Sequence, residues 1–401
     1  MKYKTYLKVR RHQENAKILG TILLILFVLW CGILGFIEYT GRRDEIVDLN
    51  TIGMYNVTPL TNEKNINVTI KGKETPKHTI VSIASVGGND FNAYVDYLTE
   101  PLRAENKIVM IDRLGTGYSD DTLDERTIIS ILEEYRTVLA NKDIPGPYIL
   151  LTHEYGALYA TYWQLIYPDE VEGVIYIDPV LMNQIPVIEE PAYAPIFSLG
   201  SKIGLQRWIY SWFHDNESFK VPNIYARAAK ALNNHSTYTF GYLSEVKNLN
   251  NNYNTLVRVL EPTQSLKMYI NSSYGFETAE DVTAYMDYAN QREKITSGKT
   301  VYNYYKGKQL DSFIEEMIST STETTNNAIA SVVEKLGNCY VVQMPGHNEI
   351  YEQMPGVVKA AVKGFVDYLD GKEPAIYERY VDSLSESWKE HAKSLMIDKE
   401  E

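Results

Sequence analysis

Five consecutive residues form the arrangement in this sequence that is most suggestive of chemistry. Residues 152–156, Thr-His-Glu-Tyr-Gly, follow a short apolar run at 148–151 and precede apolar positions at helical spacing over 157–167. This pattern predicts a buried strand, a sharp turn and a helix. Turns of this kind expose a nucleophile, usually the serine of a G-x-S-x-G pattern. Glu154 stands at the serine position, so the chemistry depends on what that carboxylate does.

Strands and helices alternate on both sides of this turn. The predicted strands cover residues 65–70, 79–85, 107–111, 148–151, 174–177, 266–271 and 339–344. The predicted helices cover residues 91–103, 127–142, 157–167, 278–296, 310–336 and 357–369. Such alternation predicts an α/β fold with a mostly parallel central sheet and helices on both faces. From residue 180 to about residue 261 the alternation breaks, and short segments with aromatic faces predict a helical cap.

The N-terminal part of the chain has the composition of a membrane anchor. Residues 18–37 contain no charged side chain, and a helix of that length spans about 30 Å, the thickness of a bilayer core. Basic residues dominate the preceding segment, which predicts a cytoplasmic N-terminus and a body outside the cell membrane. A cleaved signal peptide is the alternative, but the apolar run is long for one and no small-x-small site ends it.

These features together predict a domain organisation. It consists of a cytoplasmic basic segment at 1–17, a transmembrane helix at 18–37, an α/β domain at 44–370 with a cap at about 180–261, and a charged helical tail at 371–401. The stretch 44–64 is expected to be a linker or a first edge strand.

Charge and cysteine content exclude several classes of partner. The formal net charge is −13, and the acidic excess lies outside the basic N-terminal segment. Such a body repels phosphate backbones, so nucleic acid is not an expected partner. The chain has two cysteines, Cys31 and Cys339, which imply no disulfide framework. Neither zinc-ligand spacing nor a phosphate-binding glycine loop occurs, so we expect no metal and no cofactor.

Four motifs follow one another in an order that points to a known family. They are Asp-Arg-Leu-Gly-Thr-Gly-Tyr-Ser-Asp at 112–120, the turn at 152–156, Tyr-Pro-Asp-Glu-Val at 167–171 with Asp-Pro at 178–179, and Gly-His at 346–347. Over residues 65–369 the chain resembles the α/β-hydrolase superfamily, in its esterase and peptidase-like branch with an inserted cap. The resemblance implies the α/β-hydrolase fold, with a small-molecule ligand or substrate bound between sheet and cap. Arg113, in the first motif, is expected to pair locally.

The resemblance also implies roles for individual residues. Glu154 takes the nucleophile position and His347 the position of the base. The backbone N–H groups of Tyr155 and of Val86 or Gly87 would bind an oxyanion. The acid that orients the histidine has no unique match. Its candidates are Asp178 at the end of one strand, or Glu277, Glu280 or Asp281 after the next strand, with Asn271 or Ser272 as remnants of a lost acid.

Glu154 therefore has three interpretations. It could attack substrate as a nucleophile, as aspartate does in related dehalogenases and epoxide hydrolases, although a misplacement of about 1 Å costs on the order of a hundredfold in rate. It could act as a general base on water. Alternatively, serine chemistry is lost and Glu154 pairs with His347. The first two make the protein an active hydrolase, and the third makes it a membrane-anchored binding or regulatory protein.

Overall fold

One mixed sheet forms the centre of the molecule. The computed structural model describes residues 2–61, 63–180, 221–236, 238–272, 306–343 and 349–372, with isolated residues between 198 and 207 and between 276 and 290. Within these ranges the sheet has the order β1-β2-β4-β3-β5-β6-β7-β8. Its strands are β1 (Val57–Pro59), β2 (Asn65–Gly72), β3 (Thr79–Ile83), β4 (Lys107–Asp112), β5 (Tyr148–His153), β6 (Val171–Ile177), β7 (Leu266–Asn271) and β8 (Cys339–Gln343). Strand β2 is antiparallel to β1 and β4, and the other neighbouring pairs are parallel.

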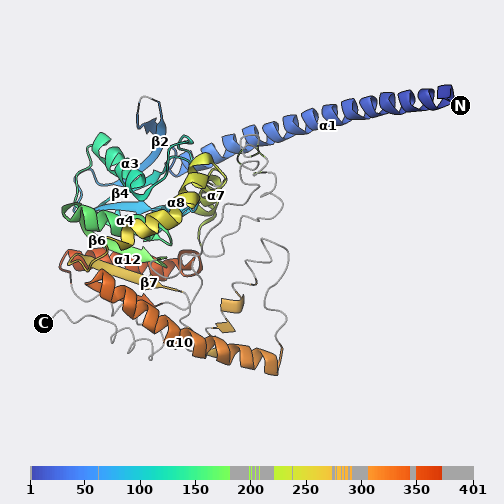
Figure 1. Cartoon of the computed structure of the whole chain (residues 1–401). Helices are drawn as coiled ribbons and strands as arrows, with labels where there is room; N and C mark the ends of the chain where they lie inside the picture. The colour runs from blue at the N-terminus through green and yellow to red at the C-terminus, as the bar shows by residue number, and fades with distance from the viewer. Residues whose placement is uncertain are drawn as a thin grey trace.

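Helices cover both faces of this sheet (Figure 1). They are α1 (Lys2–Thr51), α2 (Phe91–Leu98), α3 (Ile128–Asn141), α4 (Gly156–Ile166), α7 (Asn223–Asn233), α8 (Phe240–Val257), α10 (Lys308–Leu336), α11 (Ile350–Gln353) and α12 (Pro355–Leu369). Helices α2, α7 and α12 share one apolar core with Ile149 and Leu151 of β5. Helices α3, α4 and α8 share the other core with Leu150. The predicted α/β architecture is thereby confirmed.

The central strands are apolar because both of their faces are covered. Every residue of β3 and of β5 is buried. Successive side chains of a strand point to opposite faces, so adjacent residues of β5 enter different cores. This is why β5 reads as a continuous apolar run rather than an alternating one.

Helix α1 continues further than the sequence suggested. The stretch 44–64 was expected to be a linker or edge strand, but it is helical as far as Thr51, and only β1 fits the edge-strand expectation. Ile46 and Leu49 have helical spacing and contact the domain core, where Leu49 is fully buried. The helix ends just before Gly53, whose φ of +66° turns the chain back.

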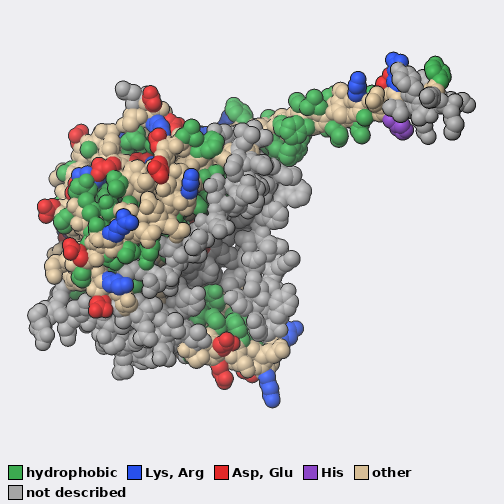
Figure 2. All heavy atoms as spheres, in the orientation of Figure 1, with side chains coloured by type: hydrophobic (Ala, Val, Ile, Leu, Met, Phe, Trp, Pro, Cys, Tyr) green, Lys and Arg blue, Asp and Glu red, His purple; other side chains and the backbone are tan. Residues whose placement is uncertain are grey.

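The outer part of α1 projects from the body as a single rod (Figure 1). It is long and apolar enough to cross a membrane, and only 6% of its most apolar stretch is buried. A signal sequence near an N-terminus has the same character. Figure 2 shows hydrophobic side chains along the projecting part and Lys and Arg side chains near its free end.

Some of the other predicted elements agree with the structure, one differs from it, and some lie outside the described residues. Helix α2 stops at Leu98, short of the expected residue 103, and a 3-10 turn containing Pro101 follows it. The described helical residues between 279 and 290 lie in the expected helix 278–296. Helices α7 and α8 lie in the stretch expected to form the cap, whereas 181–197 and nearly all of 199–220 lie outside the described residues. The tail from residue 373 onward also lies outside them.

Candidate active site

The backbone of Glu154 has an unfavourable conformation at the end of β5. Its φ is +43°, in the left-handed region that residues with a Cβ avoid. The N–H of Glu154 donates to the carbonyl of Ile177 over 3.2 Å, and its own carbonyl accepts from the N–H groups of Ala157 and Val180 over 3.1 Å. Such a conformation costs about 1–3 kcal/mol and persists only where the surroundings enforce it. The turn is therefore held from both sides.

A close approach at Gly156 completes this turn. A Cβ at this position would lie 2.4 Å from the carbonyl oxygen of Ile83 and 2.6 Å from Oγ1 of Thr152. Only glycine allows α4 to begin this close to β3. The strand, sharp turn and helix predicted around Glu154 are all present.

The side chain of Glu154 is held by a residue that sequence analysis did not place in the site. Ser85, which is 2% exposed, donates from its hydroxyl to Oε2 of Glu154 over 3.1 Å. Its only signal in the sequence was a serine where related loops carry glycine. The carboxylate of Glu154 is thus turned toward the loop after β3, which contains Val86 and Gly87, the expected oxyanion donors.

Tyr155 lies beside this carboxylate at the start of α4. It is half-buried, as is Glu154. Burial, together with the negative charge of Glu154, raises the pKa of the Tyr155 phenol. The phenol therefore stays protonated at neutral pH and remains a hydrogen-bond donor next to the carboxylate.

Arg113 supports the loop after β3 by donating to two of its backbone carbonyls. Its Nη1 donates to the carbonyl of Ala84 over 2.8 Å, and its Nη2 donates to the carbonyl of Ser85 over 2.9 Å. Nη2 also lies 2.9 Å from Oε1 of Glu245 in α8, and both side chains of this ion pair are at most 1% exposed. The expectation that Arg113 pairs locally is wrong, because its partner is 132 residues away.

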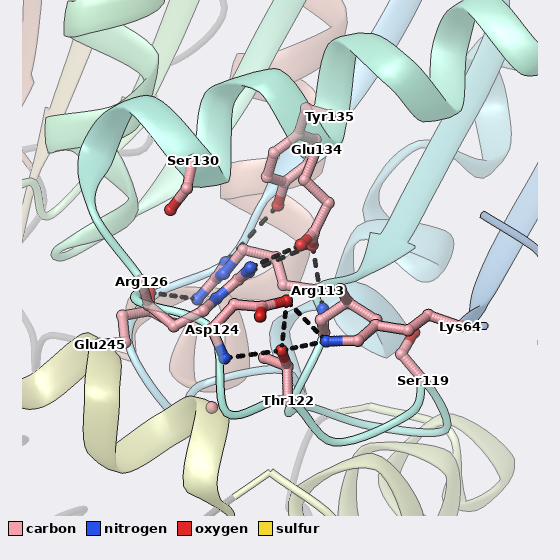
Figure 3. Close-up of polar contacts among 12 residues, drawn as sticks. Lys64, Arg113, Ser119, Thr122, Asp124, Arg126, Ser130, Glu134, Tyr135 and Glu245 are labelled. Carbon is pink, nitrogen blue, oxygen red and sulfur yellow. Dashed lines mark hydrogen bonds and ion pairs between the residues drawn. The ribbon is translucent and has the colours of Figure 1, made fainter. Parts of the chain in front are cut away.

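Two more ion pairs fix the loop that follows Arg113 (Figure 3). Arg126 contacts Glu134 over 2.6 Å, and Oε1 of Glu134 accepts from the N–H of Leu114 over 2.9 Å. Lys64 reaches Asp124 over 2.6 Å on the outer side of the loop. The motif at 112–120 therefore serves to hold the backbone around the site.

The candidate acid Asp178 is bound to the neighbouring strand. Its Oδ1 accepts from the N–H of Ser272 over 2.5 Å, and its Oδ2 accepts from the Ser272 hydroxyl. Asp178 is 7% exposed and joins the carboxyl ends of β6 and β7. His347, Glu277 and Asp281 lie outside the described residues, so the pairing of Glu154 with His347 stays a prediction.

His153, directly before Glu154, packs against aromatic side chains. Its ring stacks on Phe91 with centroids 5.3 Å apart and meets Tyr351 edge-on at 4.9 Å. Among the residues that the structure describes, no group of three or more His, Cys, Asp or Glu side chains could hold a metal ion.

Comparison with known sequences finds partial relatives. No protein-family model matches the chain. It is 34% identical over 117 residues to uncharacterized protein YbdG of Bacillus subtilis (strain 168), which is 28% of this chain and 36% of YbdG. It is 30% identical over 74 residues to uncharacterized protein YqjL of the same organism, which is 18% of this chain and 29% of YqjL. The chain therefore spans well under two thirds of the length of these relatives.

Solved structures resemble the chain over most of its length. Epoxide hydrolase VrEH1 from Vigna radiata superposes with a TM-score of 0.52 at 12% identity, covering 79% of this chain and 99% of that one. Haloalkane dehalogenase DatA from Agrobacterium tumefaciens C58 superposes with a TM-score of 0.50 at 13% identity, covering 78% and 96%. At such identities the likeness concerns the fold. Together with the strand order and the strand–turn–helix at Glu154, it shows that this chain has the α/β-hydrolase fold.

Proposed function

We propose that this chain is a membrane-anchored, extracytoplasmic protein of α/β-hydrolase fold that binds a small molecule beside Glu154 and lacks serine-nucleophile chemistry. The observation that supports this proposal is the hydrogen bond from Ser85 to Glu154. It turns a carboxylate toward the loop whose backbone would have to bind an oxyanion.

Charge explains why this arrangement opposes acyl transfer. Ester and amide cleavage by a serine builds negative charge on the substrate oxygen, and backbone N–H groups stabilise that charge. Loss of a single donor costs about a hundred- to a thousandfold in rate. A carboxylate held against the same loop repels the oxyanion, and no serine stands at the tip of the turn.

The same groups suit binding. Glu154 accepts hydrogen bonds, and the Tyr155 phenol beside it donates them. A ligand with a hydroxyl or amino group at one end fits this pair. His347 would complete the set, as the resemblance implies.

A serine-directed fluorophosphonate tests the proposal. We expect no labelling of the wild-type protein and slow labelling of Glu154→Ser, because the backbone donors come from the fold and not from the side chain. The double variant Glu154→Ser with Ser85→Ala should label as the single variant does. Labelling of the wild-type protein would contradict the proposal, and peptide mapping would identify the reactive serine.

A second candidate function is favoured by the strained φ of Glu154. Strain of this kind accumulates at catalytic groups, and two of the structures that superpose on this chain are named an epoxide hydrolase and a haloalkane dehalogenase. In this function a carboxylate oxygen attacks carbon and either opens an epoxide or expels halide. Water then attacks the carbonyl carbon of the resulting ester, the product leaves as an alcohol, and the water oxygen remains in the regenerated carboxylate.

Turnover in heavy-oxygen water separates these functions. With epoxide and haloalkane panels, a nucleophilic Glu154 gains the heavy isotope, which mass spectrometry detects in its peptide. A general base sends the isotope into product only. If the panels and activated esters give neither product nor isotope in the peptide, the binding function stands.

Topology requires its own test. Protease added to intact cells should digest the body, because the basic segment before the apolar run keeps the N-terminus inside. A fully protected body would place the domain on the cytoplasmic side and refute the anchoring scheme.

A further inference from the structure

One face of α1 is docked onto the domain from Leu34 to the end of the helix. Leu34, Glu38, Gly41, Glu45 and Asp48 recur at spacings of three and four, which places them on one side of the helix. Arg207 and Arg227 of the cap region lie along this side. We call the contacts of Glu38, Glu45 and Asp48 with the cap region the α1 clamp.

Arg207 and Arg227 bind the acidic residues of the α1 clamp. Arg207 Nε donates to Glu38 Oε2 over 2.8 Å, and its Nη2 donates to Glu45 Oε2 over 2.8 Å. Arg227 reaches Asp48 over 3.1 Å. These contacts cover more than two turns of helix, so they fix the direction of α1 relative to the domain.

Glu45 is the centre of the clamp. Its carboxylate also accepts from Asn234 Nδ2 over 2.6 Å, from the Tyr118 hydroxyl over 3.0 Å and lies 3.1 Å from His235 Nε2. Burial alone would raise the pKa of Glu45, but hydrogen bonds from His235 and Arg207 lower it to about 2. The group is ionised at any physiological pH, and the clamp stays closed.

The docked face begins inside the apolar run. Leu34 belongs to residues 18–37 and is fully buried. A Cβ on Gly204 would lie 2.8 Å from the carbonyl oxygen of Leu34 and 2.7 Å from Cβ of Glu38, so the two backbones abut there. The domain therefore meets α1 at the depth where a bilayer would end, with no spacer between them.

The direction of α1 relates this bilayer edge to the site. Glu45 contacts Tyr118, which lies beyond the carboxyl end of β4 at Asp112. Seven residues later, the carbonyl of Ile52 accepts from Lys71, which pairs with Ile108 near the amino end of β4. Followed toward its N-terminus, α1 thus leaves the domain past the carboxyl edge of the sheet.

Glu154 lies at that same edge. Strands β4 and β5 are both parallel to β3, so their carboxyl ends point the same way, and Glu154 follows β5 directly. Leu123, in the loop after β4, is 82% exposed.

We propose that the carboxyl edge of the sheet faces the bilayer and that the ligand of the Glu154 site is a single-chain amphiphile taken from the membrane. The proposal rests on the proposed function for the existence of that ligand and on α1 as the anchor. The polar end of the amphiphile would meet Glu154 and Tyr155, and its acyl chain would remain toward the lipid.

Orientation is tested with the full-length chain in phosphatidylcholine vesicles. Fluorophores are placed at Leu123→Cys, on the carboxyl edge, and at Glu74→Cys, on the opposite amino edge, in a Cys31→Ser background; Cys339 is buried. A strand of six residues is about 20 Å long, so energy transfer to acceptor lipids should be several-fold stronger from position 123. Equal transfer, or stronger transfer from position 74, would overturn the orientation.

Clamp variants show whether α1 sets this orientation. Glu45→Gln combined with Arg207→Gln should reduce the difference between the two positions. Glu14→Gln is the matched control, because Glu14 contacts Arg10 in the exposed outer part of α1, away from the clamp. If the double variant shows the same difference in energy transfer between the two positions, the clamp does not set the orientation of the domain.

Ligand class is tested with a photoactivatable long-chain alcohol in the same vesicles, because its hydroxyl group suits Glu154 and Tyr155. Illumination should label the peptide containing Glu154, and excess oleyl alcohol should reduce that labelling at least several-fold, whereas a water-soluble short-chain ester should not. Labelling of α1 alone would refute a membrane-borne ligand. That result leaves the proposed function intact, because the fluorophosphonate experiment does not depend on the source of the ligand.

Discussion

Ser85 and Glu154 are joined by a hydroxyl-to-carboxylate hydrogen bond of 3.1 Å that spans 69 residues of sequence. The bond links the loop after β3 to the tip of the strand–turn–helix. Arg113 holds the carbonyl of the same Ser85 over 2.9 Å. The Glu154 carboxylate is therefore held in place through Ser85 and Arg113.

The strained backbone at Glu154 predicts an inverted order of stability between two variants. Glycine is ordinarily less stabilising than alanine, but at a φ of +43° an alanine keeps the strain and a glycine relieves it. We expect Glu154→Gly to be more stable than Glu154→Ala by about 1–2 kcal/mol. Denaturant unfolding of the two variants measures this difference, and both have lost the Ser85 bond, so that term cancels. If Glu154→Ala were the more stable variant, the turn would have to adopt a different backbone conformation in solution, without the positive φ.

Two glycines in helices predict opposite responses to the same substitution. At Gly156 a Cβ would lie 2.4 Å from the backbone oxygen of Ile83, whereas at Gly356 no atom lies within 4 Å. Gly156→Ala should cost about 3 kcal/mol or more through forced movement of α4. Gly356→Ala, in α12, should gain up to about 1 kcal/mol from helix propensity. Thermal unfolding compares the pair, and equal effects would show that α4 does not abut β3 in solution.

The buried ion pair of Arg113 and Glu245 predicts a large single-variant effect and a partial rescue. Arg113→Met leaves the Glu245 carboxylate buried without its guanidinium partner, although the Tyr159 hydroxyl still donates to it over 2.8 Å, and should cost about 3–5 kcal/mol. Adding Glu245→Leu removes that stranded charge and should restore part of the stability. Full restoration is not expected, because the carbonyl of Ala84 still lacks its Arg113 donor and the carbonyl of Ser85 keeps only the bond from the N–H of Gly88 among those that the structure describes. Denaturant unfolding of the single and double variants tests this. If Glu245→Leu restored no stability, the loss in Arg113→Met would not come from the unpaired carboxylate.

The architecture was predictable because it is written in local patterns. Buried parallel strands are continuous apolar runs, and β7 covers the same residues, 266–271, that the apolar run predicted. The turn at Glu154 was predictable because strand, turn and helix are contiguous. The helical stretch before Thr51 was missed because its charged residues resemble a linker until their partners, such as Arg207, are in place.

The side-chain contacts of the site were not predictable in the same way. Glu245 reaches Arg113 across 132 residues, and Ser272 reaches Asp178 across 94. Such pairs depend on which loops the fold brings together, and no periodicity in the sequence encodes them. Residue type alone favoured a local partner for Arg113, and only the close packing of α8 against the sheet excludes it.

His78 predicts a pH dependence of stability that is independent of the site. It precedes β3 at the amino edge of the sheet, with Nδ1 at 2.9 Å from Glu172 and Nε2 at 3.3 Å from Asp370, while Lys77 and Lys372 also approach Asp370. Hydrogen bonding to Glu172 raises the pKa of His78 above 6.5, with burial opposing and Asp370 adding to it. A raised pKa in the folded state means that the folded protein binds the proton more tightly than the unfolded chain.

The stabilisation from His78 should therefore be complete below pH 6.5 and disappear as the pH rises through the raised pKa. In His78→Gln this component is absent, so the free energy of unfolding should fall less steeply between mildly acidic and mildly alkaline pH than in the wild-type protein. His12→Gln, in the exposed outer part of α1, is the matched control and should reproduce the wild-type slope. Denaturant unfolding across that pH range provides the measurement. If His78→Gln and wild type lose stability in parallel, the imidazolium does not bridge Glu172 and Asp370 in solution, and the contact between the amino edge of the sheet and the end of α12 depends on the lysines alone.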